Sequence, residues 1–172
     1  MTNAELAILS LIAEAPRHGY EIEQIIEARG MREWTEIGFS SIYYLLKKLE
    51  KGGLVESELI ATGGRGKARR IYTATENGRA SLLDSTLEAL SHPQQSYPAI
   101  LLGLANLPLV SADQAKSALE TYRRALDEKL EEVSATLESQ RPIPSHVELL
   151  FGHSIAMLEA EINWVEKKLA TM

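Results

Sequence analysis

Apolar side chains recur every three or four positions near the start of the chain, as on one face of a helix. Thr2, with Glu5 three residues later, has the pattern of a capping box, so the first helix begins there and ends before the break at residues 15–19. A second helix with the same spacing covers residues 20–29, and Gly30 ends it. The chain therefore opens with two amphipathic helices.

The third predicted helix, residues 40–51, separates its apolar and polar positions most sharply. Its apolar stripe contains Ile42, Leu45, Leu46 and Leu49. The opposite face contains Ser40, Tyr44, Lys47 and Lys51, flanked by Ser41, Tyr43 and Lys48. Hydroxyl and ammonium groups without a carboxylate suit phosphates and base edges, so we expect this face to bind DNA. A solvated surface helix is the alternative, and Tyr43 is open to a structural, half-buried role.

Two strands with a glycine-rich tip follow this helix. Residues 54–60 and 69–74 have strand patterns, and residues 62–67 connect them as the tip of a wing. The candidate DNA contacts in the wing are Arg65, Lys67, Arg69 and Arg70. Successive strand side chains point to opposite faces, so at most one of the last two faces DNA. The tip lacks the Gly-Lys-Ser/Thr ending of a nucleotide-binding loop, and a disordered turn is the alternative.

A further helix from the Thr75 cap to about residue 90 completes the first domain. We expect its inner side to be formed by Ala80, Leu83, Leu87 and Leu90. Three helices, a two-stranded β-wing and a trailing helix make a winged helix-turn-helix over residues 1–90. A linker rich in proline, glutamine and serine follows.

The second half, residues 96–172, is predicted to be all-helical, which makes the protein mainly α. Helices are expected at residues 99–106, 111–139 and 145–170. The last helix has a second apolar line beside its main stripe, so we expect a dimerisation domain. The expected dimer interface contains Leu150, Met157, Leu158, Ile162, Trp164 and Val165. Alternatively, the second line packs on the helix at residues 99–106 or under the first domain. Trp164 is also the nominee for an effector pocket, although a packing role is the stronger interpretation.

The net charge of −6 is unevenly distributed along the 172 residues. Residues 38–80 contain eight cations and four anions, and the rest contains ten cations and twenty anions. Because salt screens charges beyond about 8–10 Å, a basic patch acts locally despite the global sign. The chain has no cysteine and no secretory signal, and its most apolar region, residues 97–110, is too short for a membrane span. We therefore expect a soluble cytoplasmic protein without a membrane partner.

The sequence has no arrangement of residues that predicts catalysis. The four histidines (His18, His92, His146 and His153) are scattered, so neither a metal site nor a catalytic triad is predicted. His18 is interpreted as a capping or packing residue. An enzyme built on the helical half is the least favoured hypothesis, and no cofactor is expected.

Three motifs together resemble the PadR transcriptional regulators. They are His18-Gly19-Tyr20-Glu21-Ile22, residues 41–50 and residues 69–78. The resemblance implies a homodimeric winged-helix repressor whose third helix enters the major groove while the wing touches the backbone. The second half resembles the longer subgroup with a helical dimerisation domain. Some of these relatives release DNA on binding small aromatic or drug-like molecules. Gly38-Phe39-Ser40 lacks the Pro or Gly-Gln often found before the third helix, which affects the expected base preference.

These interpretations combine into a hypothesis of function. We expect a sequence-specific regulator, a homodimer that represses transcription by occluding a promoter at a roughly palindromic double-stranded DNA operator, with a possible but unknown small-molecule effector. The alternative is a winged-helix protein–protein module whose basic face binds an acidic partner.

Overall fold

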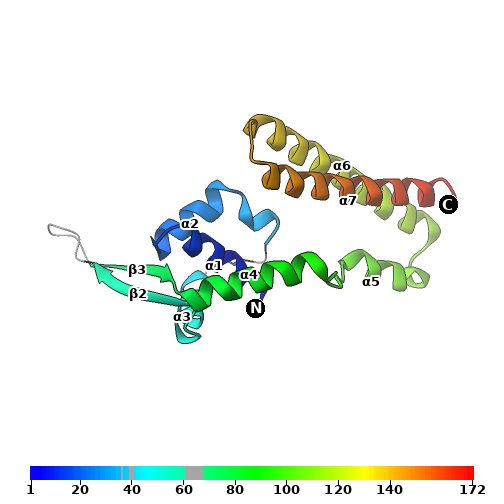
Figure 1. The fold of residues 1–172 in the computed structure, drawn as a ribbon. Helices are drawn as coiled ribbons and strands as arrows, with labels where there is room; N and C mark the ends of the chain where they lie inside the picture. The colour runs from blue at the N-terminus through cyan, green and yellow to red at the C-terminus, as the bar shows by residue number, and fades with distance from the viewer. Residues whose placement is uncertain (36, 39–40, 61–67) are drawn as a thin grey trace. The chain divides into compact units, whose positions relative to one another are not determined.

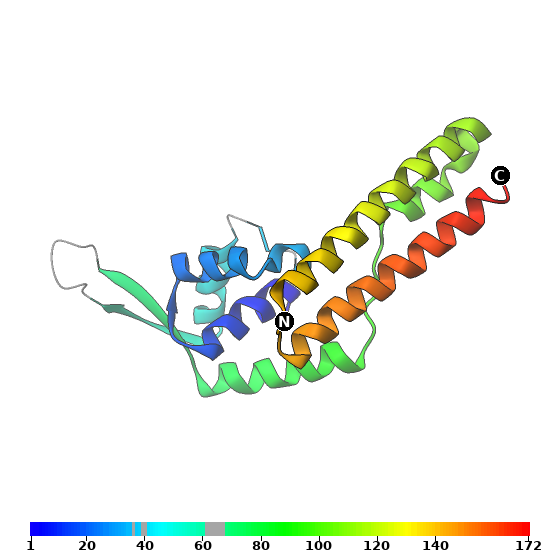
Figure 2. The same ribbon diagram turned by 90° about the horizontal axis from the view of Figure 1, so that it is seen from above.

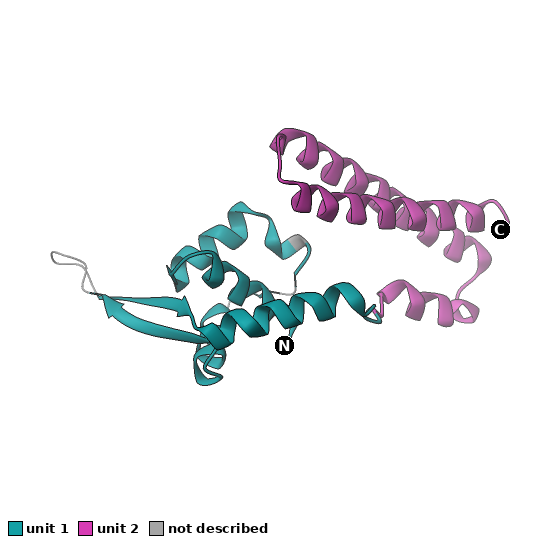
Figure 3. Ribbon diagram, viewed as in Figure 1, with its two compact units in different colours: residues 1–95 teal, residues 96–172 magenta. Residues whose placement is uncertain are grey.

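The computed structural model describes the chain except for residues 36, 39–40 and 61–67 (Figure 1). The described chain divides into two compact units, residues 1–95 and residues 96–172 (Figure 3). None of its helices is long and apolar enough to cross a membrane.

The first unit contains the predicted helices and wing strands in the predicted order, together with a short strand and a 3-10 turn that were not predicted. Its elements are α1 (Asn3–Glu14), β1 (Arg17–His18), α2 (Gly19–Ala28), the 3-10 turn η1 (Met31–Glu33), α3 (Ile42–Lys51), β2 (Val55–Ile60), β3 (Arg69–Ala74) and α4 (Glu76–Ser91). The predicted capping box opens α1: Glu5 N donates to Thr2 Oγ1, and Thr2 N donates to a Glu5 carboxylate oxygen. Thr75 caps α4 by accepting a hydrogen bond from the Gly78 amide at 3.0 Å.

The described strands form one antiparallel sheet in the order β1-β3-β2. The wing hairpin pairs Val55 with Ala74 and Ile60 with Arg69. The third strand, β1, pairs Arg17 with Tyr72 and His18 with Ile71. We predicted a two-stranded wing, because a strand of two residues is too short to show alternation. This strand places the start of α2 beside the wing.

Helix α1 lies between α2 and α4 in both views (Figure 1, Figure 2). It also contacts α3 and β3, so its apolar residues meet side chains from several directions. The fully buried side chains of this unit are Ile8, Leu9, Leu11, Ile12, Ile22, Ile26, Ile42, Leu46 and Val55. This closed core holds α3 with its polar face outward.

Two glycines have particular roles in the first unit. Helix α3 ends at Gly52 and Gly53, and glycine can adopt the left-handed conformation without steric cost. Only Gly53 adopts it, with φ +69°, whereas Gly52 has φ −78°. Gly78 allows the backbones of α4 and residue 54 to approach closely, since a Cβ there would lie 2.0 Å from the Leu54 carbonyl oxygen.

The predicted inner face of α4 is wrong. Ala80, Leu83, Leu87 and Leu90 are exposed, whereas Leu82 packs against the core. The orientation of α4 is set by the close approach at Gly78 and by Arg79, whose Nη1 donates to the Ala13 carbonyl at 3.0 Å. The leucine stripe therefore faces away from the core of its own unit.

The second unit contains α5 (Ala99–Ala105), the 3-10 turn η2 (Leu107–Leu109), α6 (Ala112–Gln140) and α7 (Ser145–Leu169). The capping box of Ser111 and Gln114 begins α6 as predicted. Helices α6 and α7 lie side by side (Figure 2). Their apolar stripes meet in one seam, in which Leu119, Leu126 and Val165 are buried.

Candidate nucleic-acid interface

Helix α3 has the predicted separation of its two faces. Ile42, Leu45, Leu46 and Leu49 are buried in the core of the first unit. The exposed side chains include Tyr43 (56% exposed), Tyr44 (67% exposed), Lys47, Lys48 and Lys51. Two exposed tyrosines beside three lysines form a surface that can donate hydrogen bonds and contact apolar groups.

The first turn of α3 contains no acidic residue. Ser41 is its N-cap residue, but the hydroxyl donates to the Gly38 carbonyl at 2.7 Å instead of accepting from the first turn. Among the described residues, no side chain caps this helix. Its first amides therefore remain available as donors to an anion. Ser40, predicted to belong to the same face, lies outside the described residues.

Lys48 differs from the other lysines of α3 because it pairs with α1. Its Nζ lies 2.6 Å from Glu5 Oε1. Burial opposes ionisation of Glu5, but hydrogen bonds from Lys48 and Thr2 outweigh it and hold the pKa of the carboxyl below its ordinary value. The same pair raises the pKa of Lys48. In the described chain, Lys47 and Lys51 form no hydrogen bond or ion pair, so their charges are less compensated.

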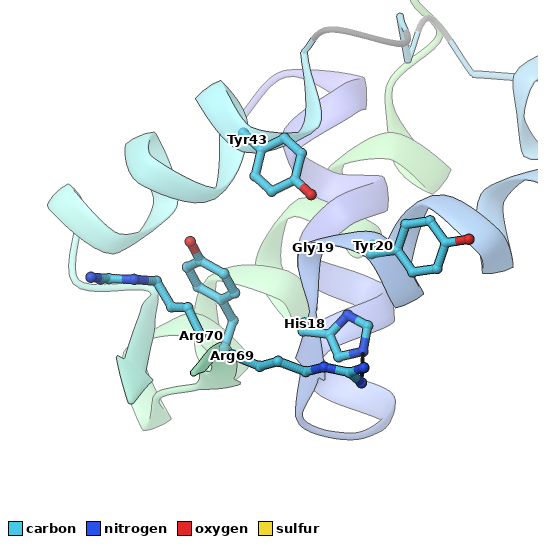
Figure 4. Close-up of a pocket in the computed structure, with 7 residues that line it drawn as sticks. His18, Gly19, Tyr20, Tyr43, Arg69 and Arg70 are labelled. Carbon is cyan, nitrogen blue, oxygen red and sulfur yellow. Dashed lines mark hydrogen bonds between the residues drawn. The ribbon is translucent and has the colours of Figure 1, made fainter. Parts of the chain in front are cut away.

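Arg69 and Arg70 leave β3 in different directions, as the strand alternation predicts (Figure 4). Arg70 donates to Ser57 Oγ at 2.9 Å and lies 3.6 Å from Glu50 Oε1, which also accepts from Ser57. Arg69 Nη1 lies 3.4 Å from His18 Nε2. The internal ion pair offsets the charge of Arg70. Arg65 and Lys67, at the predicted wing tip, lie outside the described residues.

An open hollow of about 520 Å³ lies between the start of α2, α3 and β3 (Figure 4). It is lined by His18, Gly19, Tyr20, Tyr43, Arg69, Arg70 and Tyr72. Gly19 lets the Tyr43 ring approach, since a Cβ at that position would lie 2.6 Å from Tyr43 Cε1. Tyr43 thus has a packing role as well as an exposed edge.

Sequence reasoning missed that His18 and Tyr20 belong to this surface. The predicted capping role of His18 is confirmed, because its Nδ1 accepts a hydrogen bond from the Glu21 amide at 3.0 Å. Its position beside Arg69 depends on the pairing of β1 with β3. The only signal was the nearness of His18 to a helix start, and that signal does not predict a neighbour on the wing.

The residues expected at a dimer interface divide into two groups in the single chain. Leu150 and Met157 are exposed, at 47% and 60%. Leu158, Ile162 and Trp164 are partly covered by the α6–α7 seam, and Val165 is fully covered, at 0%. Val165 therefore packs within its own chain, because residues on both helices enclose it.

Helices packed on one core, with a polar third helix and an antiparallel wing, define a winged helix-turn-helix protein. A sequence profile described as the Transcriptional regulator PadR-like family matches residues 8–84. The matched residues make up most of the first unit, which is therefore similar to this family of transcriptional regulators.

Several solved structures share the fold. Bacillus subtilis PadR in complex with operator DNA is 21% identical, with a TM-score of 0.79 and 97% of each chain covered. The same protein in complex with p-coumaric acid is 21% identical, with a TM-score of 0.80 and coverage of 99% of this chain and 98% of that one. The protein smu.1604c from Streptococcus mutans UA159 is 23% identical, with a TM-score of 0.70 and coverage of 98% and 99%. No curated protein matches the sequence.

Among the described residues, no group of three histidine, aspartate or glutamate side chains is placed to hold a metal ion.

Proposed function

We propose that the chain is a homodimeric repressor that places α3 in the major groove of a roughly palindromic operator and its wing on the adjacent backbone. The observation that carries this proposal is the exposed face of α3, where Tyr44, Lys47 and Lys51 have no hydrogen-bond or ion-pair partner among the described residues. A repressor of this kind blocks a promoter by occupying it and performs no chemistry on the DNA.

The groups on α3 suit the surfaces of a duplex. The major groove is about 12 Å wide and admits a helix. Lysine ammoniums can neutralise phosphates, and a tyrosine can donate to a phosphate or contact a thymine methyl. The closed core of the first unit supports this role, because α3 is held by four buried side chains and projects its other face outward.

Exposed apolar side chains support dimerisation. Leu149, Leu150 and Met157 of α7 are 74%, 47% and 60% exposed in the single chain. Covering them with the same surface of a second copy would form a two-fold interface. A two-fold dimer presents two reading helices, which matches a palindromic operator.

The solved relatives support DNA binding and suggest an effector. Bacillus subtilis PadR has been crystallised with operator DNA and, separately, with p-coumaric acid. We infer that a small molecule of unknown identity could release this chain from DNA by changing the spacing of its two reading helices. Trp164 packs against the α6–α7 seam, so its first role in this proposal is to anchor the core.

Selection of bound duplexes from a random library, followed by titration at several salt concentrations, tests the proposal. We expect enriched palindromic sequences and an affinity that falls linearly with salt on a logarithmic scale. Tyr44→Ala should lower discrimination between selected and scrambled duplexes by about tenfold, a typical cost of one lost base contact.

Lys47→Ala should weaken binding to both duplexes alike, because a phosphate contact carries no sequence information. Arg124→Ala, which removes a cation from α6 in the second unit, is the matched control. It should change neither the affinity for the duplexes nor the discrimination between them. If no duplex is enriched, the chain is not an operator-binding protein, and the basic face must serve an acidic protein partner.

A further inference from the structure

The hollow beside α2, defined above by its seven lining residues, is bordered by several side chains that donate hydrogen bonds. Arg69, Arg70 and His18, which carry N–H donors, line it together with Tyr20, Tyr43 and Tyr72, and the Tyr20 hydroxyl points away from the other lining residues (Figure 4). No carboxylate is among these lining residues, although the chain as a whole has more acidic than basic side chains. A concave surface with this composition suits a ligand that only accepts hydrogen bonds.

The hydrogen bond that caps α2 determines which nitrogen of His18 can donate. Nδ1 accepts from the Glu21 amide at 3.0 Å, so Nδ1 carries no hydrogen. In the neutral ring the hydrogen must then lie on Nε2, the nitrogen that faces the hollow beside Arg69. Because the cap also fixes the ring, Nε2–H is a donor with a defined direction.

His18 Nε2 and Arg69 Nη1 therefore form a pair of donors without an acceptor between them. They lie 3.4 Å apart, and in this tautomer neither can accept from the other. Figure 4 shows the Arg69 guanidinium against the His18 ring, with the Tyr20 ring beside His18. An oxygen anion placed against both would satisfy them with charge-assisted hydrogen bonds.

Two tyrosines, Tyr43 and Tyr72, line another part of the hollow. The Tyr43 ring packs over Gly19, where a Cβ would lie 2.6 Å from the ring. Burial, followed by the charge of Glu50, raises the pKa of Tyr72, which keeps its hydroxyl protonated and able to donate. No described residue accepts a hydrogen bond from the hydroxyl of Tyr43 or from that of Tyr72.

We propose that this hollow holds one backbone phosphate of the bound duplex, with His18 Nε2–H and the Arg69 guanidinium as its donors. The inference rests on the proposed DNA binding and adds His18 to the residues that position the protein. A phosphate suits this lining because each of its free oxygens accepts hydrogen bonds, whereas the major-groove edges of adenine and cytosine also present an amino donor. The hollow adjoins α3 through Tyr43, so the contact would fix the position of the reading helix along the groove.

Two substitutions, His18→Asn and Arg69→Gln, each remove one of the two donors and so test their contributions separately. Asparagine is among the best N-cap residues, so it preserves the start of α2 while removing the ring donor. We expect His18→Asn to weaken binding to the selected duplex about tenfold without changing the salt dependence, since a neutral group displaces no counterion. Arg69→Gln should reduce the slope of log affinity against log salt by about 0.9, as expected for one phosphate.

A duplex series with a single methylphosphonate at each backbone position locates the contact. Wild-type protein should lose affinity at one phosphate in each half-site, and Arg69→Gln should show no further loss at that position. Arg124→Gln in α6 should leave the whole series unchanged. Inorganic phosphate, titrated without DNA, should bind at least a hundredfold more weakly than the duplex, because it lacks the contacts of α3.

Two results would overturn the inference while leaving DNA binding intact. One is a full salt slope for Arg69→Gln together with unchanged affinity for His18→Asn. The other is tight binding of inorganic phosphate that neither variant weakens. A failure to bind any duplex would instead refute the proposed function. Thermal unfolding of both variants shows whether they are folded, and Arg69→Gln, at an exposed position, tests the site even if His18→Asn is unstable.

Discussion

The first unit encloses its core on several sides, whereas the second unit has one apolar seam between two long helices. In the first unit, α1 contacts α2, α3, α4 and β3, and nine side chains are almost completely shielded from solvent. In the second unit only Val165 is shielded to that degree. Leu102, Leu109 and Leu149 remain more than 70% exposed.

This difference indicates where each unit obtains its stability. Each buried aliphatic side chain contributes about 1.5–3 kcal/mol, so a closed core stabilises the first unit within one chain. The second unit leaves comparable side chains in water, and only another surface can recover that free energy. We therefore expect changes inside the first unit to affect folding, and changes on the outside of the second to affect assembly.

The largest expected effect is the loss of stability in Gly78→Ala. The added methyl group would meet the Leu54 carbonyl at 2.0 Å, so the two backbones must separate. Overpacking of this kind costs about 3 kcal/mol. Urea unfolding followed by circular dichroism measures the change, and wild-type stability in Gly78→Ala would show that the first unit is less closely packed than described.

Gly152→Ala in α7 is the matched control. A Cβ there meets nothing within 4 Å in the single chain, so the substitution should stabilise the helix by about 0.5–1 kcal/mol. A loss of stability at this position would sharpen the comparison, because it would mean that a second copy covers α7 at Gly152.

The next effect concerns assembly. Met157→Glu places a charge on an apolar surface that is 60% exposed in one chain. If a second copy covers it, the dimer dissociation constant should rise about thirtyfold or more, as for an interface hot spot. Sedimentation equilibrium measures this constant. Gln140→Glu, at an exposed position of α6, adds the same charge and should not alter it. A wild-type monomer at micromolar concentration would contradict the role assigned to the second unit.

Sequence reasoning predicted helix boundaries well and the burial of one helix face poorly. Ser111 with Gln114 marks the start of α6, because a capping box depends only on residues three positions apart. The burial of Leu83 and Leu87 was wrong for a physical reason. Periodicity identifies an apolar face of a helix, but it does not say what covers that face. In α4 the close approach at Gly78 turns the leucines outward.

The candidate site shows the same limit. The exposed face of α3 was predictable, because it follows from the spacing of residues 42–49 within one helix. The pairing of Lys48 with Glu5 and the approach of Arg69 to His18 were not, because each joins residues far apart in the sequence. Such contacts require the packing of α1 on α3 and of β1 on β3, which local patterns do not specify.

A smaller effect, which depends on pH, tests the stability of the first unit. Glu5→Gln keeps a residue that can complete the capping box but removes the ion pair with Lys48. Because the folded pKa of Glu5 is lowered, its stabilising contribution is present above about pH 4.5 and disappears as the pH falls through the folded value. We expect a cost of about 1 kcal/mol at pH 7 that vanishes in acid.

Urea unfolding of the wild type and of Glu5→Gln between pH 3 and pH 7 measures the difference in their free energies of unfolding. Lys48→Met should destabilise the protein at pH 7 and have a smaller effect in acid. A difference in the free energy of unfolding that does not change with pH would mean that the ion pair does not stabilise the fold, and that Lys48 is free to approach DNA.

The smallest effect lies in the seam of the second unit, where a polar contact supplements the sparse apolar packing. Tyr122 Oη donates to Glu161 Oε1 at 2.6 Å and joins α6 to α7. Burial, with the hydrogen bond and charge of Glu161, raises the pKa of Tyr122 to about 12. The stabilisation is therefore complete below about pH 10 and is lost as the pH rises toward 12.

Tyr122→Phe should cost about 0.5–1 kcal/mol at neutral pH and should remove the tyrosine that ionises near pH 12 in an absorbance titration. Tyr97→Phe, at an exposed position, is the control and should leave that late step in place. Because this bond joins the two long helices directly, its loss should lower the stability of the second unit and spare the first. An equal effect on both units would mean that they unfold together, and the contrast between a closed core and an open seam would then not describe how the chain is stabilised.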